Sequence, residues 1–334
     1  MGIKCNVTRA ESLACQALKA AGVSPDNAQS VASALIAAEI DGIPSHGLSR
    51  VPYYADQAAS GKVKGDVEPR LTERGVVMNV DAREGFAFPA IDKGMGPLVN
   101  RARESGLAAL SVGNSHHFGV AGHHVEAIAR QGLVALGFGN SPAAIAPWGG
   151  KDPLFGTNPI AFASPRECRD PLTVDLSVSK IARGKVMMAQ NRGESIPDDW
   201  ALDAEGQPTT DAAAAMAGSI RPIGDAKGSS LALMVELLTA GLSGSAFGYE
   251  ASSLFTADGE PPRLGQCFLA IDPSFFGAGA AFSERVEAIL SAMLAQEGVR
   301  LPGERRLAAR AGAIDTLMLD DGVYAELVRR AGGV

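Results

Sequence analysis

The chain has 334 residues, 46% of them hydrophobic and 20% charged, and its 30 Lys and Arg against 37 Asp and Glu give a formal net charge of −7. This composition excludes a disordered chain and a coiled coil, and the acidic balance argues against a nucleic-acid partner. At about 150 residues per domain, the length predicts about two domains. All five histidines lie before residue 125 and must supply any imidazole chemistry: His46, His116, His117, His123 and His124.

The cysteines and the N-terminal segment indicate where the protein works. Cys5, Cys15, Cys168 and Cys267 are scattered and form no CxxC pair, which is typical of reduced thiols. The segment MGIKCNVTRA lacks the apolar run of a signal peptide, and no stretch reaches the ~20 apolar residues of a membrane span. We therefore expect a cytoplasmic protein that does not bind a membrane.

The first 42 residues predict two helices. Thr8 and Glu11 have the spacing of a capping box, and the apolar pattern that follows them ends at Gly22. Ser24 and Pro25 start a second helix that runs toward Asp41 and Gly42. The first histidine, His46, then falls at a junction between helices.

The middle of the chain alternates strands and helices. Apolar runs predict strands at 75–82, 106–114 and 132–140, and helices at about 91–104 and 121–131 separate them. This order is typical of an α/β protein, and it places both histidine pairs in or near loops at strand ends.

The second half continues this order. We expect strands at 153–164, 171–179 and 266–273, a helix at about 181–192, a loop at 194–211 and an amphipathic helix at 283–297. Residues 225–244 predict a long buried helix. The last 35 or so residues, rich in Arg and Ala, predict peripheral helices.

Common site motifs are absent. The segment GAGAAF (277–282) lacks the third Gly of a dinucleotide fingerprint, and P-loop, HExxH and GxSxG motifs are missing. The pairs His116/His117 and His123/His124 offer too few ligands at a suitable spacing for zinc. We therefore expect no metal, although a metal-dependent hydrolase that uses these pairs is an alternative of a different class.

Ser45, His46 and Arg50 form a better candidate site. His46 and Arg50 are four residues apart, so on a helix they would share one face, with Ser45 as its N-cap. An imidazole beside a guanidinium suits a substrate whose carboxylate the Arg holds while the His exchanges a proton. The spacing alone leaves open a plain alternative, in which His46 caps a helix and Arg50 is a solvated cation.

A set of longer motifs resembles a known family. The segments are DGIPSHGLSRVPYY (41–54), NSHHFGVAG (114–122), PLFGTNPIAFA (153–163), VDLSVSKIARGKV (174–186), IPDDWALDAEGQPTTD (196–211), GDAKGSSLALMVELL (224–238) and LPGE (301–304). Together they resemble the malate/L-lactate/sulfolactate dehydrogenase family of non-Rossmann NAD(P)-dependent oxidoreductases. That family also contains ureidoglycolate dehydrogenase, 2,3-diketogulonate reductase and the Δ1-piperideine-2-carboxylate/Δ1-pyrroline-2-carboxylate reductases.

The resemblance implies an α/β (α+β) fold and a homodimer. A discontinuous helical domain would comprise residues 1–65 and about 283–334. Residues 66–282 would form the NAD(P)-binding and substrate domain on a mixed, mainly antiparallel sheet. This fold would explain the missing dinucleotide fingerprint.

The resemblance also assigns roles to residues. His46 would exchange the substrate proton, Ser45 would orient it, and Arg50 and Thr157 would bind substrate. NADP or NAD would be lined by His117, Phe118, Gly119, Val120, Ala121, Ser141, Asp175, Leu176, Ser177, Lys227, Arg300, Pro302, Gly303 and Glu304. His117 is an alternative proton donor, and His116 would be structural.

The implied reaction moves a hydride between the nicotinamide and a small anionic 2-oxo or 2-hydroxy acid. The alternative substrate is a cyclic imino acid, which Δ1-pyrroline-2-carboxylate/Δ1-piperideine-2-carboxylate reductases convert to L-proline or L-pipecolate. By the resemblance, the imino-acid reductases carry an acidic residue at the position that Lys185 occupies in this chain. The lysine therefore favours the hydroxy-acid branch. Lys185 would stay on the surface or meet an anionic substrate tail. The sequence does not decide between NAD and NADP.

Overall fold

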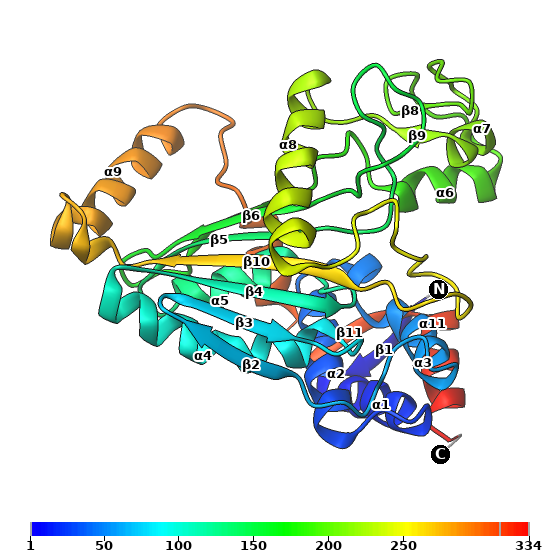
Figure 1. Cartoon of the computed structure of the whole chain (residues 1–334), viewed down its shortest axis with the longest axis horizontal. Coiled ribbons are helices and arrows are strands. Elements are labelled where there is room, and N and C mark those ends of the chain that lie inside the picture. The colour runs from blue at the N-terminus through cyan, green and yellow to red at the C-terminus, as the bar shows by residue number, and fades with distance from the viewer. Residues whose placement is uncertain (1, 314, 333–334) are drawn as a thin grey trace.

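The computed structural model describes residues 2–313 and 315–332, and a seven-stranded sheet lies at its centre (Figure 1). The strand order is β2-β3-β4-β10-β5-β6-β7. Its strands are β2 (Arg70–Arg74), β3 (Val77–Asp81), β4 (Leu107–Ser115), β5 (Val134–Gly139), β6 (Ile160–Ser164), β7 (Leu172–Leu176) and β10 (Leu264–Ile271). Within this sheet, as far as it is described, only β3 and β4 pair in parallel, so the expected mixed, mainly antiparallel sheet is confirmed.

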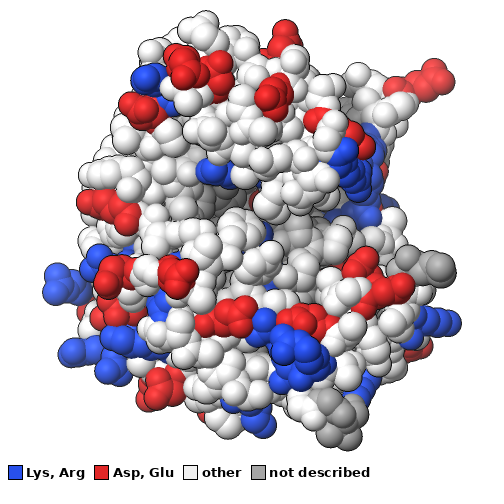
Figure 2. Space-filling view, turned by 90° about the vertical axis from the view of Figure 1, so that its right-hand side faces the viewer, with Lys and Arg blue, Asp and Glu red and all other residues white. Residues whose placement is uncertain are grey.

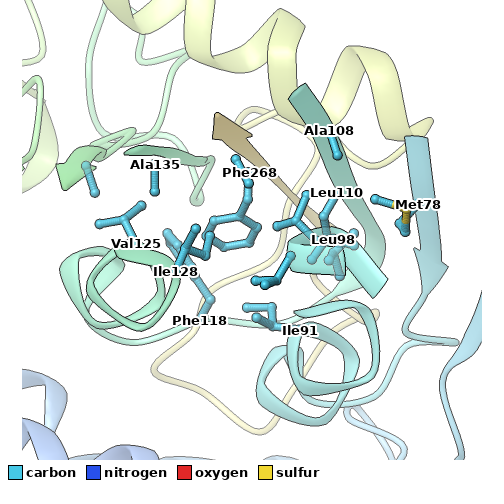
Figure 3. Close-up of a cluster of buried hydrophobic side chains, with 14 of the residues drawn as sticks. Met78, Ile91, Leu98, Ala108, Leu110, Phe118, Val125, Ile128, Ala135 and Phe268 are labelled. Carbon is cyan, nitrogen blue, oxygen red and sulfur yellow. The ribbon is translucent and has the colours of Figure 1, made fainter. Parts of the chain in front are cut away.

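Helices cover both faces of this sheet. The helices α4 (Ala87–Ser105) and α5 (Ala121–Ala129) pack on one face, and α8 (Ala226–Glu236) lies across the other. Figure 3 shows the core between the sheet and the helices α4 and α5, where Ile91 and Ile128 lie in one cluster with Phe268 of the central strand β10. Burial of this apolar surface is the main driving force for the layer.

A second core is helical and joins the two ends of the chain. It contains α1 (Val7–Ala20), α2 (Pro25–Ile40), α3 (Val51–Ala59) and α11 (Asp321–Arg330). The strand β1 (Gly2–Asn6) pairs antiparallel with β11 (Thr316–Asp320), so segments from both ends of the described chain contribute to this core (Figure 1). The proposed division into residues 1–65 with 283–334 and residues 66–282 stays a prediction.

The remaining elements lie around these two cores. A small lobe contains α6 (Arg183–Arg192), α7 (Ala212–Ala217) and the pair β8 (Ala201–Leu202) and β9 (Ser219–Ile220). The other elements are η3 (Leu237–Gly241), η4 (Pro273–Phe275), η5 (Gly279–Ala281), α9 (Phe282–Leu294) and α10 (Glu304–Gly312). In Figure 1, α9 stands away from the sheet. Across the described part of the chain, no helix has the length and apolar character needed to cross a bilayer.

The structure corrects several expectations about helix and strand ends. Asn6, whose side chain accepts from the Arg9 N–H, caps α1, so Thr8 is not the cap. The predicted strand at 153–164 begins only at Ile160, because residues before it form loops. The strands β1 and β11 were not expected, since each is short and the two pair across almost the whole chain.

Two helical predictions were also wrong in part. The segment after residue 225 is a helix, but its second half is a π-helical turn, η3. It is not buried on all sides, because Leu233, Leu237 and Leu242 are about half exposed or more. The C-terminal part is not wholly peripheral, since Arg306 and Arg310 of α10 form ion pairs with the buried Asp41.

Candidate active site

The strand ends place the candidate residues along one edge of the sheet. The pairing of Ser115 with Leu264 and of Gly139 with Gln266 brings the ends of β4 and β5 to that edge. Antiparallel pairing then adds the start of β6 and the end of β7. This edge faces α3 and the turns before it, and Figure 2 shows the surface recessed between the small lobe and the helical core.

The turn that carries Ser45, His46 and Arg50 is not an α-helix. Two 3-10 turns, η1 (Pro44–His46) and η2 (Leu48–Arg50), meet at Gly47, so the expected shared helix face and N-cap are wrong. Glu39 supports the turn by accepting from the Leu48 N–H at 2.8 Å, and burial raises the pKa of Glu39. A Cβ on Gly47 would lie 2.5 Å from the Glu39 Oε1, so only glycine permits this approach.

Tight local contacts replace the helix face. The Ser45 Oγ lies 3.0 Å from His46 Nδ1, and Arg50 Nε donates to the Ser45 carbonyl at 2.7 Å. The Arg50 guanidinium also lies over the Phe255 ring, 4.7 Å from its centroid, which is a cation–π distance. Its Nη1 is buried and has no partner among the described residues, so the guanidinium keeps a donor for a ligand anion.

His117, from the end of β4, faces this turn. Its ring centroid lies 5.3 Å from that of His46, and its Nδ1 is 2.6 Å from the Tyr54 hydroxyl of α3. Burial and the Arg50 charge lower the pKa of His46 to about 4 and place the pKa of His117 well below its usual value. Burial, which is the larger cause, and the Arg50 charge therefore both favour the neutral form of the two rings.

Ser141 and Thr157 meet at the next strand ends. Thr157 N–H donates to the Ser141 Oγ at 3.0 Å, and the two hydroxyls lie 3.3 Å apart. The Thr157 carbonyl accepts from Val178 N–H, which joins this pair to the segment after β7. The structure thus brings together a predicted substrate residue and a predicted cofactor residue from segments 16 positions apart.

A buried carboxylate holds the loops that carry this pair. Glu236 of α8 is 2% exposed, and its Oε1 accepts from Gly156 N and Asn158 Nδ2. Its Oε2 accepts from Asn140 Nδ2 and Gly248 N. Four donors from three loops therefore converge on one side chain. Three of these donors belong to direct sequence neighbours of Ser141 and Thr157.

The predicted cofactor segment after His117 is mostly buried. Phe118, Val120 and Ala121 are each less than 8% exposed, so their contacts with a ligand would come from backbone atoms. Gly119 has a φ of +72°, which favours glycine. Asp175 at the end of β7 accepts from Gly122 N at 2.7 Å and ties β7 to the first turn of α5.

The remaining predicted cofactor residues lie beside the end of β7. The Ser177 hydroxyl is hydrogen-bonded to the Ser179 hydroxyl. The segment that follows Ser177 pairs with residues 221–223, just before α8. Lys227 is exposed in the first turn of α8. A Cβ on Gly303 would lie 3.2 Å from the Thr173 carbonyl, so the 300–304 loop touches β7. Lys227 and exposed Arg300 form no ion pair with the described residues and remain available to an anion.

Three histidines have structural partners. Buried His116 lies 2.9 Å from the Gln57 Oε1, and His124 Nε2 donates to the Phe118 carbonyl. His123 Nε2 lies 2.8 Å from Asp41, in a cluster that was not expected. The other members of this cluster are Glu126, Arg306 and Arg310.

This charge cluster joins the ends of α2, α5 and α10. Arg310 donates to both Asp41 and Glu126, and Arg306 donates to Asp41 at 2.8 Å. Against the effect of burial, these partners hold the pKa of Asp41 well below its usual range, and Arg310 and Arg130 lower the pKa of Glu126 to about 2. The cluster fixes α10 directly after the 300–304 loop.

The pocket loop at 245–264, which the sequence left unread, is fastened by a buried lysine. Lys62 is 3% exposed and its Nζ donates to the carbonyls of Ser253, Thr256 and Asp258 at 2.7 to 3.0 Å. Gln57 Nε2 donates to the Leu254 carbonyl of the same loop. These bonds set the position of the loop that presents Phe255 to Arg50.

Sequence reasoning missed Tyr54, Lys62, Glu236 and Phe255. Tyr54 and Glu236 lie inside motifs that the resemblance had marked, but their roles depend on partners 63 and up to 96 positions away. Lys62 and Phe255 lie outside those motifs, and neither has a local signal.

Comparisons with known proteins identify relatives of this chain. The family model described as malate/L-lactate dehydrogenase matches residues 5–328. A (2R)-3-sulfolactate dehydrogenase (NADP(+)) of Chromohalobacter salexigens is 58% identical over 322 residues, which are 96% of each chain. A Δ1-pyrroline-2-carboxylate reductase of Ancylobacter novellus is 38% identical over 92% of this chain and 91% of its own.

Solved structures show the same fold. A Δ1-piperideine-2-carboxylate reductase from Pseudomonas syringae pv. tomato superposes with a TM-score of 0.92 at 37% identity, covering 98% of this chain and 99% of its own. A sulfolactate dehydrogenase from Methanocaldococcus jannaschii gives a TM-score of 0.90 at 29% identity, covering 99% and 98%. The chain therefore belongs to the malate/L-lactate dehydrogenase family.

Proposed function

We propose that this protein is an NADP-dependent dehydrogenase that interconverts a small 2-oxo acid with a second anionic group, such as sulfopyruvate, and the corresponding 2-hydroxy acid. As a member of its family it is an NAD(P)-dependent oxidoreductase that acts on 2-hydroxy or imino acids. The finer choice of substrate and coenzyme rests on the 58% identity to a sulfolactate dehydrogenase that uses NADP(+).

The single observation that supports the dehydrogenase chemistry is that the His46 ring lies 5.3 Å from the His117 ring while Arg50 donates to the carbonyl of the neighbouring Ser45. Arg50 keeps a buried, unpaired Nη1 for the substrate carboxylate. A bound carboxylate offsets the Arg50 charge that, together with burial, lowers the pKa of His46. Substrate binding therefore favours a protonated His46 at the moment when negative charge develops on the substrate oxygen.

The residues of the turn support this proton transfer. Ser45 Oγ contacts His46 Nδ1 and so orients the ring, leaving Nε2 for the substrate. Phe255 covers one face of the Arg50 guanidinium, which fixes its plane and keeps water from that face. General acid catalysis of this kind typically contributes about 10²–10⁴ to the rate.

The residues along the sheet edge fit a nicotinamide dinucleotide. Lys227 and Arg300 are exposed cations without an ion pair in the described structure, which suits phosphate groups. Backbone atoms of 118–121 and the hydroxyls of Ser141 and Ser177 would hold the rest of the molecule. When bound, the nicotinamide supplies or accepts the hydride, and the protein supplies orientation and the proton.

The test is a coenzyme oxidation screen. Purified protein is assayed with NADPH and NADH against sulfopyruvate, oxaloacetate, pyruvate, Δ1-pyrroline-2-carboxylate and Δ1-piperideine-2-carboxylate. We expect sulfopyruvate with NADPH to give the highest kcat/KM. A higher value with a cyclic imino acid would refute the proposed substrate and support the alternative reductase.

A variant then tests the proton donor. His46→Ala should lose turnover, with coenzyme binding retained by fluorescence titration. Normal turnover in His46→Ala together with its loss in His117→Ala would show that His117 exchanges the proton. Lys185 is exposed on α6. Its contact with an anionic substrate tail stays a prediction.

We also propose that the protein is a cytoplasmic homodimer. The resemblance to a dimeric family supports a second copy as partner, and exposed apolar side chains such as Ile289 of α9 (63% exposed) and Leu242 (67% exposed) are available to such a contact. All four cysteines are free thiols, as expected in a reducing compartment. Sedimentation equilibrium should give twice the mass of the chain, and a single-chain mass would refute the dimer.

A further inference from the structure

We infer that Tyr54 is a positioning residue that holds His117 in one tautomer, as a fixed hydrogen-bond donor, and so leaves proton exchange to His46. The inference rests on the proposed function, in which both imidazoles face the substrate. Two observations support it: the hydrogen bond between the Tyr54 hydroxyl and His117 Nδ1, and the contact between the His46 and His117 rings.

The direction of the Tyr54 hydrogen bond follows from burial. Tyr54 is fully buried, and within the described residues its hydroxyl makes one hydrogen bond, the 2.6 Å contact with His117 Nδ1. If Nδ1 carried a proton and donated it, the hydroxyl hydrogen would be buried without an acceptor. Buried donors are almost always paired, so the hydroxyl donates and Nδ1 accepts.

This direction fixes the other nitrogen of His117. In a neutral imidazole one nitrogen is protonated, so an accepting Nδ1 requires a proton on Nε2. Within the described residues the His117 ring makes its hydrogen bond through Nδ1, so the Nε2–H is available to a bound molecule. His117 can therefore donate a hydrogen bond, but its Nε2 cannot accept a proton.

The surroundings hold His117 in this neutral form. Burial, Arg50 and His46 all lower the pKa of His117, which opposes an imidazolium. Burial raises the pKa of Tyr54, which opposes loss of the hydroxyl proton through Nδ1. His46 differs, because its Nδ1 partner is the Ser45 hydroxyl, which can either donate or accept and so permits both protonation states.

The packing around Tyr54 keeps the hydroxyl in place. The Tyr54 ring meets Phe86 and His116 with centroid distances of 5.6 and 5.1 Å. His116 is itself fixed, because Gln57 Nε2 donates to the Leu254 carbonyl and leaves its Oε1 to accept from His116 Nε2. Phenylalanine at position 54 would keep these ring contacts and remove only the donor.

The test reads the tautomer directly by NMR. Protein labelled with ¹⁵N-histidine gives ring-nitrogen chemical shifts that separate Nδ1–H from Nε2–H forms, and His117→Gln assigns the signal. We expect His117 to be the Nε2–H form in the wild type. An Nδ1–H form would overturn the inference, and this measurement needs neither turnover nor the Tyr54 variant.

The variant Tyr54→Phe then tests the role in catalysis. We expect it to mix the two tautomers, to raise the pH at which His117 takes up a proton, and to lower kcat/KM about tenfold, as for one lost hydrogen bond. Tyr324→Phe, on α11, is the matched control and should change none of these. An unchanged tautomer or an unchanged kcat/KM in Tyr54→Phe would overturn the positioning role.

The two failures are distinguishable. If no 2-oxo or imino acid is reduced by the wild type, the proposed function fails while the NMR result still stands. If turnover is normal and His117 is the Nδ1–H form, the inference about Tyr54 fails alone.

Discussion

Glu236→Gln should destabilise the protein although the two side chains have nearly the same shape. Each carboxylate oxygen of Glu236 accepts two hydrogen bonds, one from an Asn side chain and one from a Gly backbone N–H. A Gln amide has only one oxygen, so either orientation points its NH₂ at two donors. Neither Asn can turn over freely, because the Asn140 Oδ1 accepts from Gly265 N and the Asn158 Nδ2 also donates to the Ala232 carbonyl.

The expected loss follows from these contacts. Hydrogen bonds to a charged acceptor contribute about 1.5–3 kcal/mol each, so two lost bonds predict a decrease of about 3–6 kcal/mol in the free energy of unfolding. Because the loops carry Ser141 and Thr157, the KM for substrate should rise as well. Urea unfolding monitored by circular dichroism measures the first effect and steady-state kinetics the second.

Glu260→Gln is the matched control, since Glu260 is exposed, and surface substitutions of this kind change stability by about 0.5 kcal/mol or less. A decrease below about 1 kcal/mol for Glu236→Gln would refute the argument. It would mean that the loops keep their positions without the carboxylate.

Three further outcomes are expected. Asp41→Asn should lower the free energy of unfolding by about 3–5 kcal/mol in urea, because it removes the buried anion that pairs with the partly buried Arg306 and Arg310. A loss equal to that of exposed Asp26→Asn would contradict this. Lys227→Ala should raise the KM for NADPH about tenfold to a hundredfold with little change in kcat, and an unchanged KM would remove Lys227 from the phosphate site. Thermal stability should fall as the pH drops below about 6.5. Several buried histidines have lowered pKa values in the folded state, so below their unfolded pKa they bind fewer protons when folded than when unfolded, and acid favours the unfolded chain. A Tm that is flat from pH 7 to pH 5 would contradict this reading for His46, His116, His117 and His124.

Most of the central sheet could be predicted from the sequence. The runs at 75–82, 106–114 and 132–140 became β3, β4 and β5, because strands buried in a covered sheet are continuously apolar. β2 has the sequence RLTER and is mostly exposed, so it carries no such signal. β1 and β11 form strands because they pair with each other, and no local sequence pattern reveals a partner more than 300 residues away.

The candidate site could be predicted only as a set of residue types. The motif around residue 46 indicated a proton donor beside a carboxylate-binding cation, and the structure places the two side chains in one turn. The helical geometry expected for them was wrong, because a Glu39 carboxylate packed against Gly47 folds the turn differently. Tyr54 and Phe255 act through neighbours that only the tertiary fold supplies.

The pairing of the two chain ends sets an order for folding during synthesis. The central sheet uses residues 70–271 and can assemble while the C-terminal segment is still inside the ribosome. The helical core that supports the 44–50 turn must wait, because β11, α11 and the Arg310 partner of Asp41 are made after the strands of the sheet. A chain truncated at residue 300 and released from the ribosome should therefore resist protease in its sheet while α1, α2 and the turn are still cleaved.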